Sequence, residues 1–295
     1  MAIHIDANDI GEAWLQAYRS LMGAPGRSLV NLAVNIRDPL VEDTGVRAAL
    51  ERDLAQLRAA KTGTTWHSVH TVANTIFPIS LYHPQLPDAA SRFFDLSLAG
   101  SQARHGKNKG WGTYIGRLVA YQGPDGKHIN QLDRMLRLLR ESRHWADLYE
   151  APLTYAGETL TADEAVGADM HIIGPGDRRR RGGPCLAHLS LTSARGKLHL
   201  TAQYRRHSYV ARAYGNFVGL ARLLNFLACE SGHDVGTVFV IGTHAEIEPV
   251  PGRVELLDAA IAAVGQQRPI ETSSRPLGAT WSDLDLPAIS SNGAL

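Results

Sequence analysis

The alternation of apolar and polar positions along the chain predicts several β-strands. Residues 28–36 place apolar side chains at every second position, which is typical of a strand with one buried face. Residues 186–204 alternate in two arms around the sequence Ala-Arg-Gly-Lys at positions 194–197, and this pattern predicts a β-hairpin. Residues 238–241 are continuously apolar, which favours a buried strand.

Helices are predicted where apolar residues recur at intervals of three and four positions. A leucine-rich, apolar helix is predicted to begin at Asn216. The other predicted helices cover residues 8–22, 44–58, 128–140 and 253–265.

Other segments are predicted to be irregular. Residues 100–113 are glycine-rich and basic and should form a loop, and Pro78 should end any helix within the apolar segment 67–82. Towards its C-terminal end the chain becomes polar and rich in proline. Residues 271–295 are therefore expected to form an irregular tail that follows a single domain of residues 1–270.

Composition excludes several classes of protein. The 295 residues are 44% hydrophobic, as in globular proteins, and a formal net charge of +1 indicates no general affinity for nucleic acids or anionic membranes. No apolar run approaches the roughly 20 residues that span a bilayer. The first residues lack the basic and apolar regions of a secretory leader. The two cysteines form no metal-ligand motif and favour a reduced, cytoplasmic setting.

Cys185 is the first candidate for chemistry. It follows four arginines at positions 178–181 and the sequence Gly-Gly-Pro at 182–184. Nearby cations stabilise a thiolate, which is the nucleophilic form of cysteine, so Cys185 is a candidate nucleophile. Taken alone, a buried inert cysteine beside a solvated basic loop is the commoner arrangement.

Two sequence blocks give this cysteine a context. The first block runs from Cys185 through the sequence Gly-Lys-Leu and Arg205 to Asn216. The second block is Tyr114 followed by the sequence PDGKHINQ at 124–131. In this order and at these separations the chain resembles thymidylate synthase and its relatives, the nucleotide hydroxymethylases.

The resemblance implies a fold, an assembly and a reaction. The fold would be α/β of the thymidylate synthase type, a mixed sheet layered with helices, in a homodimer that packs its sheets face to face. The substrate would be a pyrimidine nucleoside monophosphate, and the donor of a methyl or hydroxymethyl group would be 5,10-methylenetetrahydrofolate. Four hairpin leucines are expected to supply part of the dimer face: Leu189, Leu191, Leu198 and Leu200.

The resemblance also implies roles for individual residues. Cys185 would add to C6 of the pyrimidine and make C5 nucleophilic. Arg205 would bind the phosphate through two parallel hydrogen bonds, with Arg206 as a secondary phosphate ligand. Asn216 offers a donor and an acceptor that match N3–H and O4 of uracil. Tyr114 is a candidate hydroxyl for proton removal from C5.

Two further substrate-binding residues follow from the resemblance. His244 is expected near the sugar and phosphate, and Arg143 matches one of the arginines that the family donates across its dimer. Structural roles remain alternatives for the whole set: a solvated basic surface for the arginines, a helix cap for Asn216 and core packing for Tyr114.

The chain departs from the family pattern on the folate side. Asn74 aligns with the catalytic glutamate, and an amide cannot shuttle protons as a carboxylate does. Ser208 aligns with an aspartate that contacts the pterin, and Arg212 aligns with a glycine that lines its pocket. We therefore expect folate binding to be weak, or to use a rebuilt pocket that includes Arg212 and residues 145–168.

Three functions are consistent with these residues. The first is an enzyme that modifies C5 of a pyrimidine nucleotide. The second is an enzyme of the same fold that uses Cys185 addition without folate, and the third is a catalytically silent nucleotide-binding protein. A Cys–His hydrolase built on Cys185 and His188 is disfavoured, because residues three apart on a strand point to opposite faces.

Overall fold

The computed structural model describes residues 3–60, 66–108, 113–122, 128–141, 149–153, 184–249 and 267–274. The strands of the main sheet are β1 (Ile3–Ala7), β2 (Ser28–Ile36), β6 (Glu150–Pro152), β7 (Leu186–Ala194), β8 (Lys197–Tyr204), β9 (His207–Ser208) and β10 (Asp234–Glu246). Two small sheets pair β3 (Val41–Asp43) with β11 (Gln267–Pro269), and β4 (Tyr121–Gln122) with β5 (His128–Ile129).

The helices of the described ranges are α1 (Ile10–Met22), α2 (Thr44–Ala59), α3 (Val69–Ala73), α4 (Ala89–Asn108), α5 (Tyr114–Val119), α6 (Gln131–Arg140) and α7 (Tyr214–Ser231). Short 3₁₀ turns are η1 (Pro25–Arg27) and η2 (Ile79–Leu81). A π-helical turn, η5 (Tyr209–Ala213), leads directly into α7.

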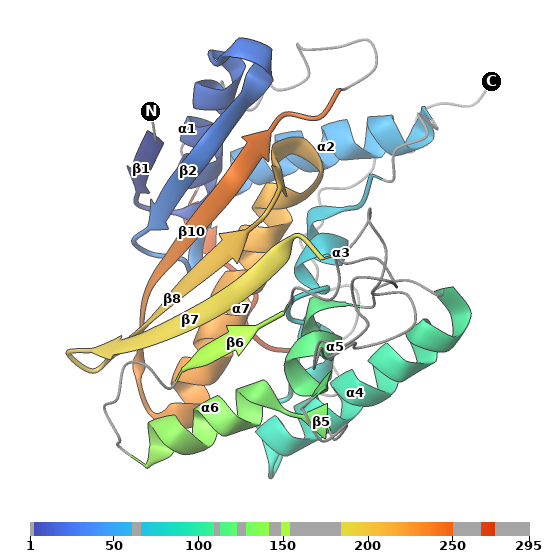
Figure 1. Ribbon diagram of the computed structural model, residues 1–295, viewed down its shortest axis with the longest axis vertical. Helices are drawn as coiled ribbons and strands as arrows, with labels where there is room; N and C mark the ends of the chain where they lie inside the picture. Colours follow the sequence, from blue (N-terminus) through green and yellow to red (C-terminus); the bar gives the residue numbers. More distant parts are fainter. Residues whose placement is uncertain are drawn as a thin grey trace, which may run out of the picture.

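The main sheet has seven strands in the order β1-β2-β10-β8-β7-β6, and β9 pairs with β10 beside this path. β1 and β2 are parallel, as are β8 and β10, whereas β2 with β10 and β7 with β8 are antiparallel. The helices lie on one side of this mixed sheet (Figure 1). The predicted α/β fold, a mixed sheet layered with helices, is confirmed.

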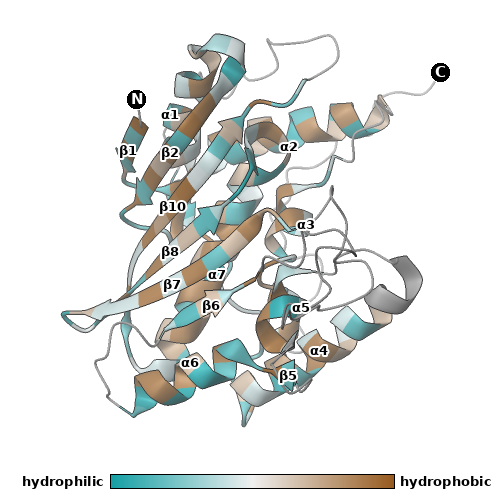
Figure 2. Cartoon of the chain, viewed as in Figure 1, coloured by the Kyte–Doolittle hydropathy of each residue, from teal (hydrophilic) through white to brown (hydrophobic). Residues whose placement is uncertain are grey.

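The β7–β8 hairpin has the predicted boundaries. Its turn residues Arg195 and Gly196 both have positive φ, which matches the right-handed twist of the two strands and favours a tight two-residue turn. Hydrophobic and hydrophilic positions alternate along the strands of the main sheet (Figure 2). This alternation gives each strand one face towards the helices and one face away from them.

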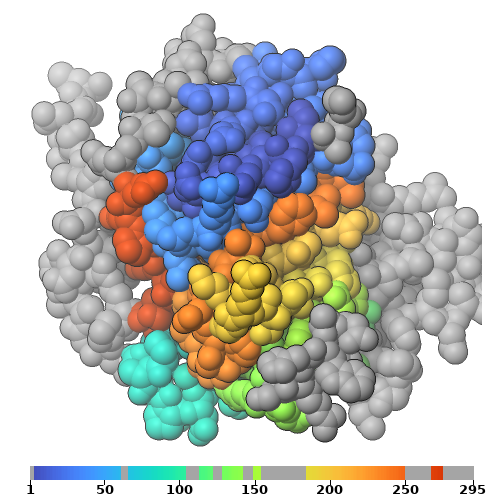
Figure 3. Space-filling model, turned by 90° about the vertical axis from the view of Figure 1, so that its left-hand side faces the viewer, coloured from blue at the N-terminus to red at the C-terminus, as the bar shows by residue number. Residues whose placement is uncertain are grey.

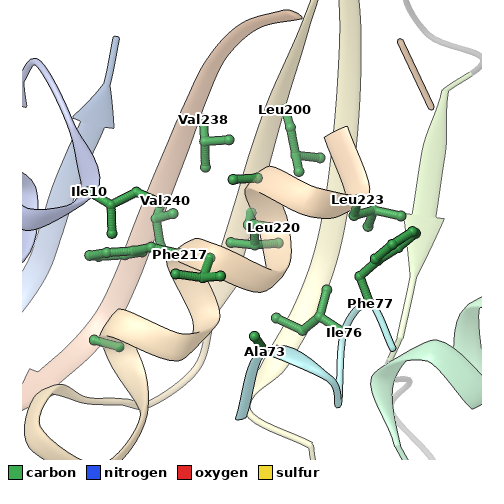
Figure 4. Packing of buried hydrophobic residues seen from close by; sticks show 14 of the residues in the cluster. Ile10, Ala73, Ile76, Phe77, Leu200, Phe217, Leu220, Leu223, Val238 and Val240 are labelled. Carbon is green, nitrogen blue, oxygen red and sulfur yellow. The ribbon is translucent and has the colours of Figure 1, made fainter. Parts of the chain in front are cut away.

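Helix α7 forms the centre of the core between the sheet and α3. Phe217 and Leu220 on α7 lie beneath strand residues such as Val240, while Ile76, just after α3, packs against the opposite side of α7 (Figure 4). Nearly every residue from Tyr214 to Ala228 is buried. An apolar surface on all sides is what a helix enclosed by two layers requires.

Close packing of α3 on α7 depends on glycine. A Cβ atom added at Gly219 would lie 2.8 Å from the carbonyl oxygen of Ala73 and 3.0 Å from Cβ of Ile76. We expect Gly219→Ala to lower the free energy of unfolding by about 1–3 kcal/mol, because backbone atoms of α3 must move. Gly100→Ala on exposed α4 is the control: its Cβ meets nothing within 4 Å, and the higher helix propensity of alanine should add up to about 1 kcal/mol. Urea unfolding measures both changes, and equal stabilities would contradict the packing argument.

Several predicted boundaries differ from the structure. Residues 100–108, predicted as a loop, continue helix α4, whose first half is anchored by buried Phe93 and Phe94. Helix α6 begins at Gln131 because Asn130 caps it and residues 128–129 form a strand. β11 pairs with β3 and Ile270 is buried, and both lie within the predicted domain of residues 1–270. The predicted helix 253–265 lies outside the described residues.

The expectation for the hairpin leucines is wrong. Leu189, Leu191, Leu198 and Leu200 are each at most 1% exposed, because all four point towards the helices. Because these side chains are buried in the core of a single subunit, they have no exposed surface with which to form a dimer face. The opposite side of the sheet carries the intervening residues, among them Thr201, Phe239 and Ile241.

That opposite side of the sheet lies at the surface of the described structure. In Figure 1 the described helices lie behind the strands, and Figure 3, viewed from the β1 side, shows the N-terminal residues (blue), β10 (orange) and the hairpin (yellow) next to one another. The residues of this side, such as Phe239 and Ile241, have intermediate exposure. Val30 on β2, predicted on the buried face with Leu32, is instead 65% exposed, next to Asn31 with its positive φ. No helix in the described ranges is both long and apolar enough to cross a bilayer.

Candidate active site

The hairpin brings Cys185 and Arg205 together at the end opposite its turn. Cys185 directly precedes β7 and Arg205 directly follows β8, and the pairing of Leu186 with Tyr204 places them side by side. The backbone N–H of Arg205 donates to the carbonyl oxygen of Cys185 at 2.8 Å. Antiparallel pairing therefore makes neighbours of two residues that are distant in the sequence.

The guanidinium of Arg205 turns back over the same strand end. Its Nε and Nη2 donate to the carbonyl oxygen of Pro184 at 3.2 and 2.6 Å. No carboxylate of the described residues forms an ion pair with it, so its charge is balanced by a carbonyl dipole alone. Such a guanidinium retains the capacity to bind an anion.

Tyr114 reaches the same point from another element. It is the first residue of α5, which Thr113 caps, and its side chain is buried. Its hydroxyl oxygen accepts a long hydrogen bond of 3.4 Å from the N–H of Leu186. Burial, with the nearby Cys185 thiol as a second cause, raises the pKa of Tyr114 to about 12, so the hydroxyl is neutral at pH 7.

The Cys185 thiol is partly buried and packs against the core. Burial raises the pKa of this thiol above its ordinary value. The positive charges of Arg205, Arg206 and Arg212 offset part of that rise. The arginine run at 178–181, from which a stabilised thiolate was expected, lies outside the described residues. Within the described structure burial has the larger effect, and the resting thiol is mostly protonated at neutral pH.

Arg206 and His244 meet at one carboxylate. Arg206 Nε donates to Oε1 of Glu246 at 2.6 Å, and His244 Nε2 lies 3.3 Å from Oε2 of the same residue. All three lie where the β8–β9 connection crosses the end of β10. Arg206 is therefore already paired with a carboxylate, in contrast to Arg205, so its guanidinium is less available to bind an anion.

The π-helical turn brings Arg212 towards this group. The turn is held at its start by the carboxylate of Glu248, which accepts from the N–H groups of Val210 and Ala211 at 3.1 and 3.0 Å. Arg212 is partly buried and interacts electrostatically with Tyr114, Glu248 and Cys185. The position that the resemblance gives to a folate-lining glycine thus carries a cation close to the thiol.

Asn216 is the third residue of α7 and caps no helix. Its side chain is 4% exposed, and its Nδ2 lies 3.2 Å from Nε2 of His207. The His207 ring stacks on Tyr204, with centroids 4.3 Å apart and planes 9° apart. The expected opening of the helix at Asn216 is wrong, because the π-helical turn and Tyr214 precede it.

The remaining candidates are engaged elsewhere or lie outside the described residues. Arg143 lies outside the described residues. Asn74 ends α3 and uses its amide internally, with Nδ2 2.9 Å from His70 Nε2 and Oδ1 accepting from the N–H of Ile79 at 3.4 Å. His188 pairs with Glu150 on β6, so the described structure supplies no Cys185–His188 pair. Cys229 is exposed on α7.

Sequence reasoning missed Glu248 as a support of the site and gave His207 no defined role. Glu248 lies 38 positions from Val210 and 37 positions from Ala211 in the sequence, so no local pattern predicts its contact with the π-helical turn. The burial of His207 had one indirect signal, the aromatic residues Tyr204, Tyr209 and Phe217 around it in the sequence. No group of three or more metal-ligating side chains is present in the ranges that the structure describes.

Comparison with known proteins gives a distant relationship. A protein from Methanothermobacter marburgensis named "Putative thymidylate synthase" is 22% identical over 260 residues, covering 85% of this chain and 95% of that protein. A protein of the same name from Methanothermobacter thermautotrophicus is 23% identical over 264 residues, again covering 85% of this chain and 95% of that protein. The relationship is thymidylate synthase-like. No family model matches the chain.

Proposed function

We propose that this protein is a thymidylate synthase-like enzyme that modifies C5 of a pyrimidine nucleoside monophosphate by methyl or hydroxymethyl transfer. The observation that carries the proposal is the meeting of Cys185, Tyr114 and Arg205 at one end of the β7–β8 hairpin. The distant similarity to the two Methanothermobacter proteins along 85% of the chain supports it.

The first chemical step belongs to Cys185. The thiol loses its proton and the sulfur forms a bond to C6 of the pyrimidine, which moves the electron pair of the C5–C6 double bond onto C5 and O4. The enolate then attacks a one-carbon electrophile through C5. The C5 proton passes to solvent, and departure of the thiolate, which regains a proton, restores the C5–C6 double bond. The carrier of the one-carbon group would leave before this, and its place would be taken by water for a hydroxymethyl product or by a hydride from the reduced folate for a methyl product. Because the Tyr114 hydroxyl is neutral, it serves this sequence as a donor or proton relay.

Substrate binding is assigned to the polar residues around the thiol. Arg205 binds the phosphate, since its guanidinium has no carboxylate partner among the described residues. Asn216 recognises the base through its amide, and Arg206 with His244 lies on the Glu246 side of the site. These assignments put nucleotide recognition at the end of β8, on β10 and at the start of α7.

The residues present fit the one-carbon donor only in part. Methylenetetrahydrofolate, when bound, supplies the electrophilic carbon. Arg212 provides a cation that could contact a folate carboxylate or pterin carbonyl, but the Asn74 amide is occupied by His70 and Ile79 and offers no carboxylate relay. This observation favours a second candidate, Cys185 addition to a nucleotide without folate.

The assembly proposed is a homodimer joined through the exposed side of the main sheet. Phe239 and Ile241 on β10, next to Ala33 on β2, supply apolar area there in place of the buried leucines. Light scattering at micromolar concentration should give twice the mass of the chain. A monomer at that concentration contradicts this part of the proposal.

Release of tritium from C5 tests the function. The protein is mixed with [5-³H]dUMP or [5-³H]UMP, with and without methylenetetrahydrofolate, and tritium in water is counted. Release that requires folate supports the first candidate, and release without folate supports the second. Binding of nucleotide with no release under either condition contradicts both and leaves a catalytically silent binding protein.

A further inference from the structure

We propose that His207 is a positioning residue that fixes the orientation of the Asn216 amide and thereby makes the site select uracil over cytosine. This inference rests on the proposed function, because it assigns a specificity to the same nucleotide site. His207 would touch neither substrate nor the reacting atoms. It would act entirely through Asn216.

An asparagine by itself does not distinguish the two bases. Its amide presents an acceptor oxygen beside a donor N–H, and rotation by 180° exchanges them. With the oxygen facing N3, the amide accepts from N3–H and donates to O4 of uracil. After rotation it donates to N3 and accepts from the N4 amine of cytosine. Selection therefore needs a group that holds the amide in one orientation.

His207 is placed to do this. Its Nε2 lies 3.2 Å from Nδ2 of Asn216, and both side chains are buried, at 1% and 4% exposure. An amide nitrogen only donates hydrogen bonds, so Nε2 must accept, and the proton of a neutral ring must sit on Nδ1. One N–H of Asn216 is thereby engaged, while the oxygen and the second N–H remain for a base.

The surroundings of His207 keep its ring neutral. Tyr204 stacks on one face, and Phe217 meets the ring edge-to-face with centroids 5.7 Å apart. Burial lowers the pKa of His207 to about 3, so the ring is neutral throughout the physiological pH range and one of its two nitrogens keeps a lone pair that can accept. A protonated ring would donate from both nitrogens and would turn the amide over.

Two buried polar atoms beside this contact lack partners within the described residues. They are Nδ1 of His207 and the hydroxyl of Tyr204. Tyr204 also interacts electrostatically with Tyr114 and Cys185, so the stacked pair links Asn216 to the nucleophile through packed side chains. A buried polar group without a partner lowers the stability of the fold, so stability alone does not explain why two such groups occur at this position.

Nucleotide binding to the intact protein and a matched pair of variants tests the inference. His207→Phe keeps an aromatic ring for stacking but removes the acceptor, and Tyr209→Phe changes another buried aromatic residue of the same cluster while leaving His207 in place. Calorimetry with UMP, CMP and their deoxy forms gives the ratio of uracil to cytosine affinity. We expect His207→Phe to lower this ratio about tenfold or more, as for the loss of one well-placed hydrogen bond, and Tyr209→Phe to leave it within about twofold.

A measurement on the unmodified protein covers the case in which His207→Phe does not fold. ¹⁵N NMR of the histidine ring should show a proton on Nδ1, none on Nε2, and no titration between pH 5 and 8. A proton on Nε2 overturns the inference, as does an unchanged affinity ratio in folded His207→Phe that still binds uracil nucleotides. Absence of binding to every pyrimidine nucleotide overturns the proposed function together with this inference.

Discussion

Cys185→Ser is expected to abolish both tritium release from C5 and covalent trapping of a 5-fluoropyrimidine nucleoside monophosphate. A serine hydroxyl is not ionised near neutral pH and is a far weaker nucleophile than a thiolate, so addition at C6 should fall by several orders of magnitude. The side chain is nearly isosteric, and the backbone contact between positions 185 and 205 is retained. Nucleotide affinity and thermal stability should therefore change little.

Cys229→Ser is the matched control for this substitution. Cys229 is exposed on α7 and has no part in the proposed site, so the variant should keep full activity. Mass spectrometry of the trapped complex, followed by peptide mapping, locates the adduct. An adduct on Cys229, or equal trapping in both variants, would remove Cys185 as the nucleophile.

Arg205→Ala should weaken binding of a monophosphate far more than binding of the nucleoside. Loss of charge-assisted hydrogen bonds costs on the order of 1.5–3 kcal/mol, which is roughly a 10- to 150-fold loss of affinity. The nucleoside carries no phosphate, so its affinity should change by less than about threefold. Calorimetry with both ligands measures the two changes.

Lys197→Ala is the matched control, because it removes one positive charge, as Arg205→Ala does. Lys197 is exposed at the turn end of the same hairpin, so its removal lowers the net charge without touching the site. If Lys197→Ala weakened phosphate binding as much as Arg205→Ala, the effect would be a general one of charge. If Arg205→Ala weakened both ligands equally, the contact with Pro184 would be its main role and Arg205 would be structural.

Local patterns predicted much of the fold. The alternation in residues 28–36 and 186–204 matches β2 and the β7–β8 hairpin, because strand periodicity and the Arg-Gly turn are local properties. The helices predicted at 8–22 and 44–58 correspond closely to α1 and α2. These elements form where the hydrophobic period, the cap and the turn residues all agree.

Predictions failed where distant contacts decide the structure. The period of two shows that Leu189 and Leu198 share a face, but it does not show which face the helices cover. The π-helical turn before α7 is held by Glu248, which lies two residues after the end of β10, and its contribution cannot be seen in residues 209–213. Helix α4 extends through its glycines although local propensity favours a loop.

The candidate site shows the same division. The separations among Cys185, Arg205 and Asn216 suggested the resemblance, and the structure places the first two side by side. The protonation state of the thiol depends instead on burial against the core, which composition and charge pattern do not report. The sequence likewise does not reveal that His207 is the hydrogen-bond partner of Asn216, because the π-helical turn between the two residues brings their side chains together.

The hairpin that joins Cys185 to Arg205 also sets which changes of length the chain can accept. Its tip at Arg195 and Gly196 lies at the far end of both strands, so added residues there would leave the pairing of Leu186 with Tyr204 intact. A single residue inserted within one arm would turn every following side chain of that arm to the other face. Insertions and deletions between positions 185 and 205 should therefore be confined to the tip.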